Sequence, residues 1–456
     1  MSQRKYWITE WEPENESFWQ SRGKRIAWRN LVWSILAENV GFSVWMVWSI
    51  VATRLPAAGF QYTTDQLFQL VALPGLVGAV MRLPYTLAVP KFGGRNWTIV
   101  SALLLLIPTL ALIALVQDPT TPFWMMALAA ATAGFGGGNF ASSMANISYF
   151  FPDKNKGFAL GLNAAGGNIG VSTVQLLVPI VLGFALLPGS TGNIHLENAG
   201  LIWLPVILIS VAGSWFGMEN LSSAKANVRE QFAVVRRGHT WLLSVLYIGT
   251  FGSFVGFSAA LPLLLKTQFP EVTTNLAFLG ALVGSVARPL GGKLADRFGG
   301  PVLTFFAFIS MALVAGALLF ALEKHSLVLF LGTFLLLFST TGIGNGSTFR
   351  MIPATFREFH TRRAAPDAAS QAEALATARR ETAAVIGLIS AIGALGGYFV
   401  PRGLGASIKA TGGPGMALAY FLGFYVVCLT LTWWCYMRKS SVLAETVRPS
   451  LAPAKA

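Results

Sequence analysis

Long apolar runs dominate the pattern of residues along this chain. Runs of about twenty residues recur between Leu31 and Leu431, and a helix of that length spans the hydrocarbon core of a bilayer. The pattern predicts an all-α polytopic membrane protein with twelve transmembrane helices. We expect these helices near residues 31–53, 67–90, 97–116, 123–150, 158–187, 199–217, 241–264, 274–292, 302–321, 327–352, 383–401 and 416–437.

Positive charge gathers on one side of these helices. Of the 33 Lys and Arg residues, 25 lie in the first 30 residues, in the loops after even-numbered helices, or in the C-terminal tail. The opposite loops hold only Arg54, Lys266, Lys324, Arg402 and Lys409. Because cytoplasmic loops of membrane proteins carry the excess of Lys and Arg, we expect both termini in the cytoplasm.

The composition excludes several classes of function. The chain has 456 residues, of which 54% are hydrophobic and 11% are charged, whereas soluble domains have about 25% charged residues. A soluble enzyme is therefore excluded, and the net charge of +14 comes without the Lys/Arg-rich block that binds nucleic acid. Cys428 and Cys435 lack the His or carboxylate neighbours of a metal site, so we expect neither a metal nor a cofactor.

The two halves of the chain repeat the same spacing. Arg82 and Arg288 are each followed eleven residues later by a Gly-Gly pair, at an offset of 206, and glycine-rich segments 134–138 and 342–346 repeat at an offset of 208. Two parallel six-helix halves are the layout of the major facilitator superfamily. The expected parts are a cytoplasmic arm (1–30), a first half (31–218), a cytoplasmic linker (219–240), a second half (241–437) with a cytoplasmic insertion (357–382), and a cytoplasmic tail (438–456).

Arg82 and Arg288 are the strongest candidates for a binding site. An arginine at the centre of a spanning helix costs at least about 2.5–3.5 kcal/mol, and neither residue has a carboxylate within one helical turn. Snorkelling of each side chain to the cytoplasmic interface is the alternative. Because the two residues repeat at equivalent positions, we expect them to converge on an anion where the halves meet. A planar guanidinium suits a small planar oxyanion.

Four segments of the chain closely resemble the bacterial nitrate/nitrite porter (NarK) family. They are Ala141–Ser148, Gly161–Val171, Phe251–Ser258 and Gly387–Gly397. The second and fourth look like the paired nitrate signatures of that family, and the resemblance extends from Trp11 to the final helix.

The resemblance implies a role for particular residues. It makes Arg82 and Arg288 the anion-binding arginines and places the rings of Phe140 and Phe251 on the two faces of a flat anion. Four further positions match polar or close-approach positions around the anion: Tyr247, Asn168, Gly387 and Ser390. The two phenylalanines could instead be ordinary core aromatics, and Asn168 could merely bond between helices. This chain departs from the family pattern at Ala164, Arg350 and Glu38.

Glu38 is the only acidic residue well inside an apolar run. Carboxylates within the membrane commonly serve in proton relays, which makes Glu38 a candidate for proton coupling. The alternatives are structural, namely an ion pair with Arg82 or Arg350 or a local hydrogen bond with Asn39 or Ser43. The sequence alone does not separate these interpretations.

These features together predict a carrier in the bacterial inner membrane. It would import nitrate in exchange for nitrite by alternating access, as a monomer that binds small inorganic anions and no nucleic acid. Proton-coupled nitrate symport through Glu38 is the alternative within the same class. A channel is disfavoured because the half-repeat is typical of carriers, and an enzyme is disfavoured because no nucleophile–base pair, metal set or cofactor loop occurs within the predicted spans.

Overall fold

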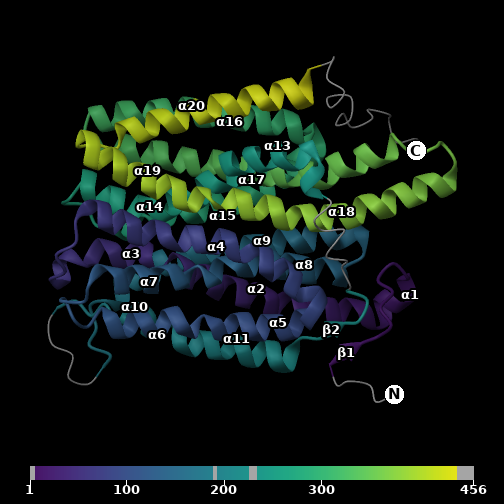
Figure 1. Ribbon diagram of the computed structural model, residues 1–456, viewed down its shortest axis with the longest axis horizontal. Helices are drawn as coiled ribbons and strands as arrows, with labels where there is room; N and C mark the ends of the chain where they lie inside the picture. Colours follow the sequence, from purple (N-terminus) through teal and green to yellow (C-terminus); the bar gives the residue numbers. More distant parts are fainter. Residues whose placement is uncertain (1–5, 188–192, 225–233, 439–456) are drawn as a thin grey trace.

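The computed structural model describes residues 6–187, 193–224 and 234–438, and Figure 1 shows it as a bundle of long helices. The start of the predicted arm, the middle of the predicted linker and nearly all of the predicted tail lie outside these residues. The first half contains β1 (Trp7–Ile8), α1 (Glu16–Phe18), α2 (Lys24–Met46), α3 (Trp48–Arg54), α4 (Thr64–Phe92), α5 (Gly94–Leu104), α6 (Leu106–Leu115), α7 (Phe123–Ala133), α8 (Phe135–Phe150), α9 (Asp153–Val181), α10 (Asn198–Leu201) and α11 (Trp203–Gly217). The second half contains α13 (Gly238–Tyr247), α14 (Ser253–Gln268), α15 (Phe278–Phe298), α16 (Gly300–Glu323), α17 (Leu327–Thr361), α18 (Ala368–Ala394), α19 (Gly396–Thr411) and α20 (Gly415–Thr432), preceded by β2 (Asn220–Leu221).

These elements confirm the predicted fold class. Ten helical runs within the described residues are long and apolar enough to cross a membrane. The two other predicted spans correspond to α7 with α8 and to α15. Glycines in α8 and the charged residues of α15 lower the hydropathy of these two runs.

Three helical segments extend well beyond the apolar runs that predicted them. The first helical run begins at Glu16, because the side chain of Asn15 caps it by accepting hydrogen bonds from the backbone of Ser17 and Phe18. The predicted insertion 357–382 is mostly helical, since α17 continues to Thr361 and α18 begins at Ala368. Hydropathy alone marks only the part of a helix that crosses the lipid.

The short strands fasten the start of the described chain to the junction between the halves. In Figure 1, β1 and β2 lie beside each other near the N-terminus, and Trp7 pairs with Asn220 in parallel register. An ion pair between Arg29 and Glu219 adds to this junction. The predicted arm is therefore docked on the bundle where it is described.

The two halves are built alike at equivalent glycines. Gly93 and Gly299 follow α4 and α15 with positive φ angles of 88° and 90°. A Cβ atom on Gly134 would collide with the backbone of Gly78, and one on Gly342 would collide with the backbone of Gly284. The same helix pair therefore packs in close backbone contact in each half, as the repeat predicts.

The halves meet through α4, which packs against α18 and α19, and through α9, which packs against α15. We call the end of the bundle with Glu16 the terminal face and the end with Asp65 the distal face; β1 and α1 lie at the terminal face in Figure 1. Ion pairs link the halves at each face, Asp153 with Arg379 at the terminal face and Asp65 with Arg402 at the distal face. The centre of the molecule is enclosed between them.

The turn after α15 supplies a test of this repeat geometry. Gly299→Ala is expected to lower the free energy of unfolding by about 1–3 kcal/mol, because an L-residue rarely adopts a φ of 90°. Thermal unfolding in detergent measures the loss. Gly332→Ala is the control, since a methyl group at this helical position meets no atom within 4 Å. Equal melting temperatures for the two variants would contradict the positive φ angle at Gly299 as a requirement of the fold.

Candidate functional site

The site begins with two arginines buried in the centre of the bundle. Arg82 on α4 has no exposed surface, and Arg288 on α15 is 5% exposed. Arg82 donates through Nε to the carbonyl of Gly137 at 3.1 Å and through Nη1 to the carbonyl of Ser390 at 3.0 Å. Its side chain therefore bridges the two halves, and it does not reach an aqueous interface as snorkelling requires.

Both guanidinium groups lie against the same pair of aromatic rings. The Cζ atom of Arg82 is 4.7 Å from the ring centroid of Phe140 and 4.8 Å from that of Phe251. The corresponding distances for Arg288 are 5.3 Å and 5.9 Å. These are cation–π distances, so the two arginines converge on one aromatic pair.

Each arginine keeps one buried donor nitrogen free. Nη2 of Arg82 and Nη1 of Arg288 have no hydrogen-bond partner among the described residues. No ion pair joins either guanidinium to a carboxylate in that part of the chain. A buried donor without an acceptor is costly, and two such donors on arginines that share one aromatic pair favour binding of an anion with several acceptor oxygens.

Phe140 and Phe251 stack on each other with ring centroids 5.9 Å apart and an interplanar angle of 25°. Atoms in van der Waals contact lie about 3.5–4.0 Å apart, so a flat anion between two rings needs a gap of about 7 Å. The rings would have to separate by about 1 Å or more to hold an anion between their faces. The structure therefore brings the predicted pair together in a tighter arrangement than a sandwich.

The remaining predicted residues lie around this centre in different ways. The hydroxyl of Tyr247 accepts a hydrogen bond from Nη2 of Arg288 at 3.4 Å, and its ring stacks on Phe251. Ser390 contacts Arg82 through its backbone carbonyl, while its hydroxyl donates to the carbonyl of Gly387. A side chain at Gly387 would collide with Thr86 of α4, so this glycine allows close approach of α18 to α4.

Asn168 is fully buried on α9, and neither its amide nitrogen nor its amide oxygen has a partner among the described residues. The interhelical hydrogen bond that was the alternative for this residue is thus absent from that part of the structure. A buried amide with both groups free is unusual in a folded protein. No hydrogen bond joins Asn168 to either arginine there.

Sequence reasoning missed two aromatic residues near the site and one buried amide on α17. The ring of Trp45 lies 5.7 Å from Cζ of Arg82, and that of Phe349 lies 5.6 Å from Cζ of Arg288. Asn345 on α17 is fully buried, and neither of its amide groups has a partner within the described part of the chain, as for Asn168. Asn345 lies in the repeated glycine-rich segment 342–346, and this position was the only signal available in the sequence.

Glu38 is fully buried between α2, α8 and α9. Its Oε2 atom accepts hydrogen bonds from the hydroxyl of Ser143 and, at 2.7 Å, from the amide of Asn163. Its Oε1 atom has no partner in the described residues. The carboxyl group acts electrostatically on both central arginines without forming an ion pair with them.

Three of the partners that the sequence offered for Glu38 bind other groups instead. Arg350 pairs instead with Asp296 through an Nε–Oδ1 hydrogen bond of 2.7 Å near the terminal face. Asn39 and Ser43 donate to backbone carbonyls of α9, each at 2.9 Å. Glu38 therefore belongs to a hydrogen-bonded cluster with Ser143 and Asn163.

Comparison with known proteins identifies the family to which this chain belongs. The family model described as Major Facilitator Superfamily matches residues 39–378. The nitrate/nitrite transporter NarU of Escherichia coli (strain K12) is 45% identical, over 95% of this chain and 97% of that protein. The probable nitrate/nitrite antiporter NarK2 of Thermus thermophilus is 37% identical, again over 95% of this chain and 97% of its own length.

A solved structure agrees on the fold. The crystal structure of a D-xylose-proton symporter superimposes with a TM-score of 0.66 at 16% identity, over 92% of this chain and 99% of that one. The repeat, the buried arginine pair and the full-length likeness to nitrate/nitrite transporters lead to one conclusion. This chain belongs to the major facilitator superfamily and, within it, to the nitrate/nitrite porter family.

Proposed function

We propose that this protein carries nitrate and nitrite across the membrane in exchange for each other by alternating access. The observation that carries the proposal is the pair of buried arginines, Arg82 and Arg288, which share one aromatic pair and each keep a donor nitrogen without a partner among the described residues. The names of the relatives supply the substrate class, since they are described as nitrate/nitrite transporters and a probable antiporter.

A small planar oxyanion suits this arrangement better than a larger ligand. Guanidinium groups present N–H donors in a plane that matches an oxyanion, and Phe140 and Phe251 would cover the two faces of a flat anion once they separate. Tyr247 and the unpartnered amide of Asn168 would supply further polar contacts. Ser390 and Gly387 would act by letting α18 approach α4.

Exchange follows from the charge of the site. Two like charges repel strongly where the dielectric constant is low, so closing the site around two empty arginines is costly. One bound monovalent anion offsets part of that repulsion, and the carrier then changes conformation only when loaded. A carrier that moves only when loaded exchanges one anion for another.

The orientation and cellular setting are also part of the proposal. We place the terminal face in the cytoplasm, because the Lys and Arg residues concentrate on that side. The protein would lie in the bacterial inner membrane as a monomer, since one chain supplies both halves of the site. It would act as a carrier rather than an enzyme.

Proton-coupled nitrate symport is the second candidate function, and the buried position of Glu38 supports it. The carboxyl group is buried, and one of its oxygens has no partner among the described residues. Its other oxygen accepts a hydrogen bond from Ser143, which lies one helical turn from Phe140 on α8. A proton on Glu38 would change the charge that the two arginines experience. Such a site could link proton movement to anion binding.

Arg82→Lys and Arg288→Lys are each expected to abolish nitrate uptake while leaving the protein folded. Lysine keeps the positive charge but loses the planar set of donors. Uptake into reconstituted vesicles measures transport, and the rise in melting temperature on adding nitrate measures binding. Arg350→Lys is the matched control, because Arg350 pairs with Asp296 away from the centre. Near-normal transport by either central variant would rule out the two-arginine site.

Phe140→Ala or Phe251→Ala is expected to weaken discrimination against non-planar anions. The rings lie on both guanidinium groups and would contact the faces of a flat anion, so their removal makes room for a pyramidal one. Competition of chlorate against labelled nitrate measures the change. Phe254→Ala is the control, since Phe254 is a buried ring of α14 that packs on Phe338 instead. Unchanged chlorate competition in both variants would show that the two rings only pack in the core and do not contact the anion.

Glu38→Gln is expected to leave a folded protein with intact nitrate/nitrite counterflow, because Glu38 forms no ion pair that the change would break. If Glu38 carries a coupling proton, the variant also loses any acceleration of uptake by an inward proton gradient. Glu323→Gln, at an exposed acid, is the control. A stability loss of about 3–5 kcal/mol, as for broken buried ion pairs, would instead show that Glu38 balances the arginines.

A further inference from the structure

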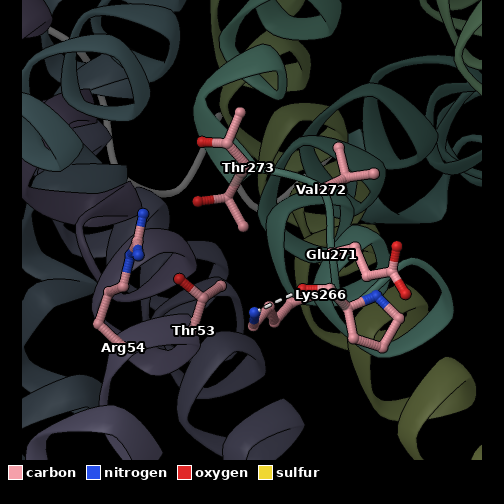
Figure 2. Close-up of a pocket in the computed structure, with 8 residues that line it drawn as sticks. Thr53, Arg54, Lys266, Glu271, Val272 and Thr273 are labelled. Carbon is pink, nitrogen blue, oxygen red and sulfur yellow. Dashed lines mark hydrogen bonds between the residues drawn. The ribbon is translucent and has the colours of Figure 1, made fainter.

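A second cationic pocket lies at the distal face, away from the central arginines. It has a volume of about 200 Å³, which exceeds the ~30 Å³ of liquid occupied by one water several-fold. One wall is the end of α3 with Thr53 and Arg54, and the other is Lys266 of α14 with the loop 270–274 that follows. Figure 2 shows the two walls facing each other. The pocket is therefore shared between the two halves of the protein.

Two buried donor groups of this pocket lack partners among the described residues, whereas the hydroxyl of Thr53 donates to the carbonyl of Ile50 and that of Thr273 accepts from the backbone of Asn275. Nε of Arg54 and Oγ1 of Thr274 are buried and have no hydrogen-bond partner within the described ranges. Lys266 donates to the carbonyl of Pro270 at 2.7 Å and keeps further donor capacity. Glu271 is the one acid of the lining, and its carboxylate points away from the space between Arg54 and Lys266 in Figure 2.

The two cations of this pocket have no paired carboxylate among the described residues, unlike Arg402 and Lys409 on the same face. Arg402 and Lys409 both lie near the carboxylate of Asp65, at 2.9 Å and 3.8 Å. Arg54 and Lys266 form no ion pair in the part of the chain that the structure describes. Two unpaired cations in a concave site attract small anions and raise their local concentration.

We propose that this pocket is an outer binding subsite for a small oxyanion at the distal mouth of the carrier. Arg54 and Lys266 hold the anion by charge, and Thr274 adds a hydroxyl donor. The ligand is the transported anion itself, so the inference rests on the proposed function. Because its walls belong to different halves, the subsite exists while the halves are together at the distal face and comes apart when that face opens. When the distal face opens, an anion held there is released between the two halves, on the distal side of Arg82 and Arg288.

Thiol labelling tests the subsite without any transport assay. Thr273→Cys places a reactive group on the exposed rim of the pocket. A negatively charged methanethiosulfonate is expected to react on the order of tenfold faster than a positively charged one, and nitrate is expected to slow it. The wild-type protein serves as the control, because it measures the background reaction of Cys428 and Cys435 with each reagent.

The charge variants complete the labelling test. Arg54→Gln and Lys266→Gln, alone and together, should reduce the preference for the anionic reagent and the protection by nitrate. Lys324→Gln removes an exposed cation of the same face outside the pocket and should leave both unchanged. Equal reactivity toward both reagents in the parent Thr273→Cys protein would overturn the proposal.

Transport measured from each side tests the role of the subsite. Arg54→Gln with Lys266→Gln should raise the KM for nitrate entry from the distal face several-fold with little change in maximal rate, and should leave entry from the terminal face unchanged. An equal effect on both sides would contradict an outer subsite. If the wild-type protein fails to exchange nitrate and nitrite while the labelling results hold, the proposed function falls and the anion subsite remains.

Discussion

The structure depends on the confinement of two like charges in a medium of low dielectric constant. Arg82 and Arg288 lie fully or almost fully buried without a paired carboxylate among the described residues. Burying the two charges costs free energy, and the surroundings offset only part of that cost. The carbonyls of Gly137 and Ser390, the shared aromatic rings and the more remote charge of Glu38 supply this part. In the proposed mechanism, the part that is not offset drives the binding of an anion, so that the same two arginines would bind the anion and control closure.

Close helix packing makes this confinement possible. Gly134 against Gly78 and Gly342 against Gly284 bring equivalent helices into backbone contact in the two halves, and α4 and α15 thereby present their arginines to the same point. The hydrogen bond from Arg82 to the carbonyl of Ser390 crosses from one half to the other. A motion that separates α4 from α18 breaks this bond, which under the proposed mechanism would link the conformational change to the state of Arg82.

Sequence reasoning reached the parts of this arrangement that appear as spacing. The repeat of Arg82 and Arg288 with their glycines predicted the two parallel halves, and the structure has them. Other features depend on contacts between distant segments and have no local signature, such as the proximity of Phe349 to Arg288 and the hydrogen bonds of Ser143 and Asn163 to Glu38. The helix start at Glu16 was missed because a capped polar helix outside the lipid leaves no mark in hydropathy.

The most direct measurement of the central claim is counterflow of labelled nitrate into vesicles that contain the purified wild-type protein. The account predicts saturable uptake that requires nitrite or nitrate inside the vesicles and that continues in the presence of a protonophore, because the empty site does not close and reorient. Uptake that needs no internal anion and collapses with the protonophore would contradict it. That result would mean that a proton, and not a second anion, allows the two arginines to return.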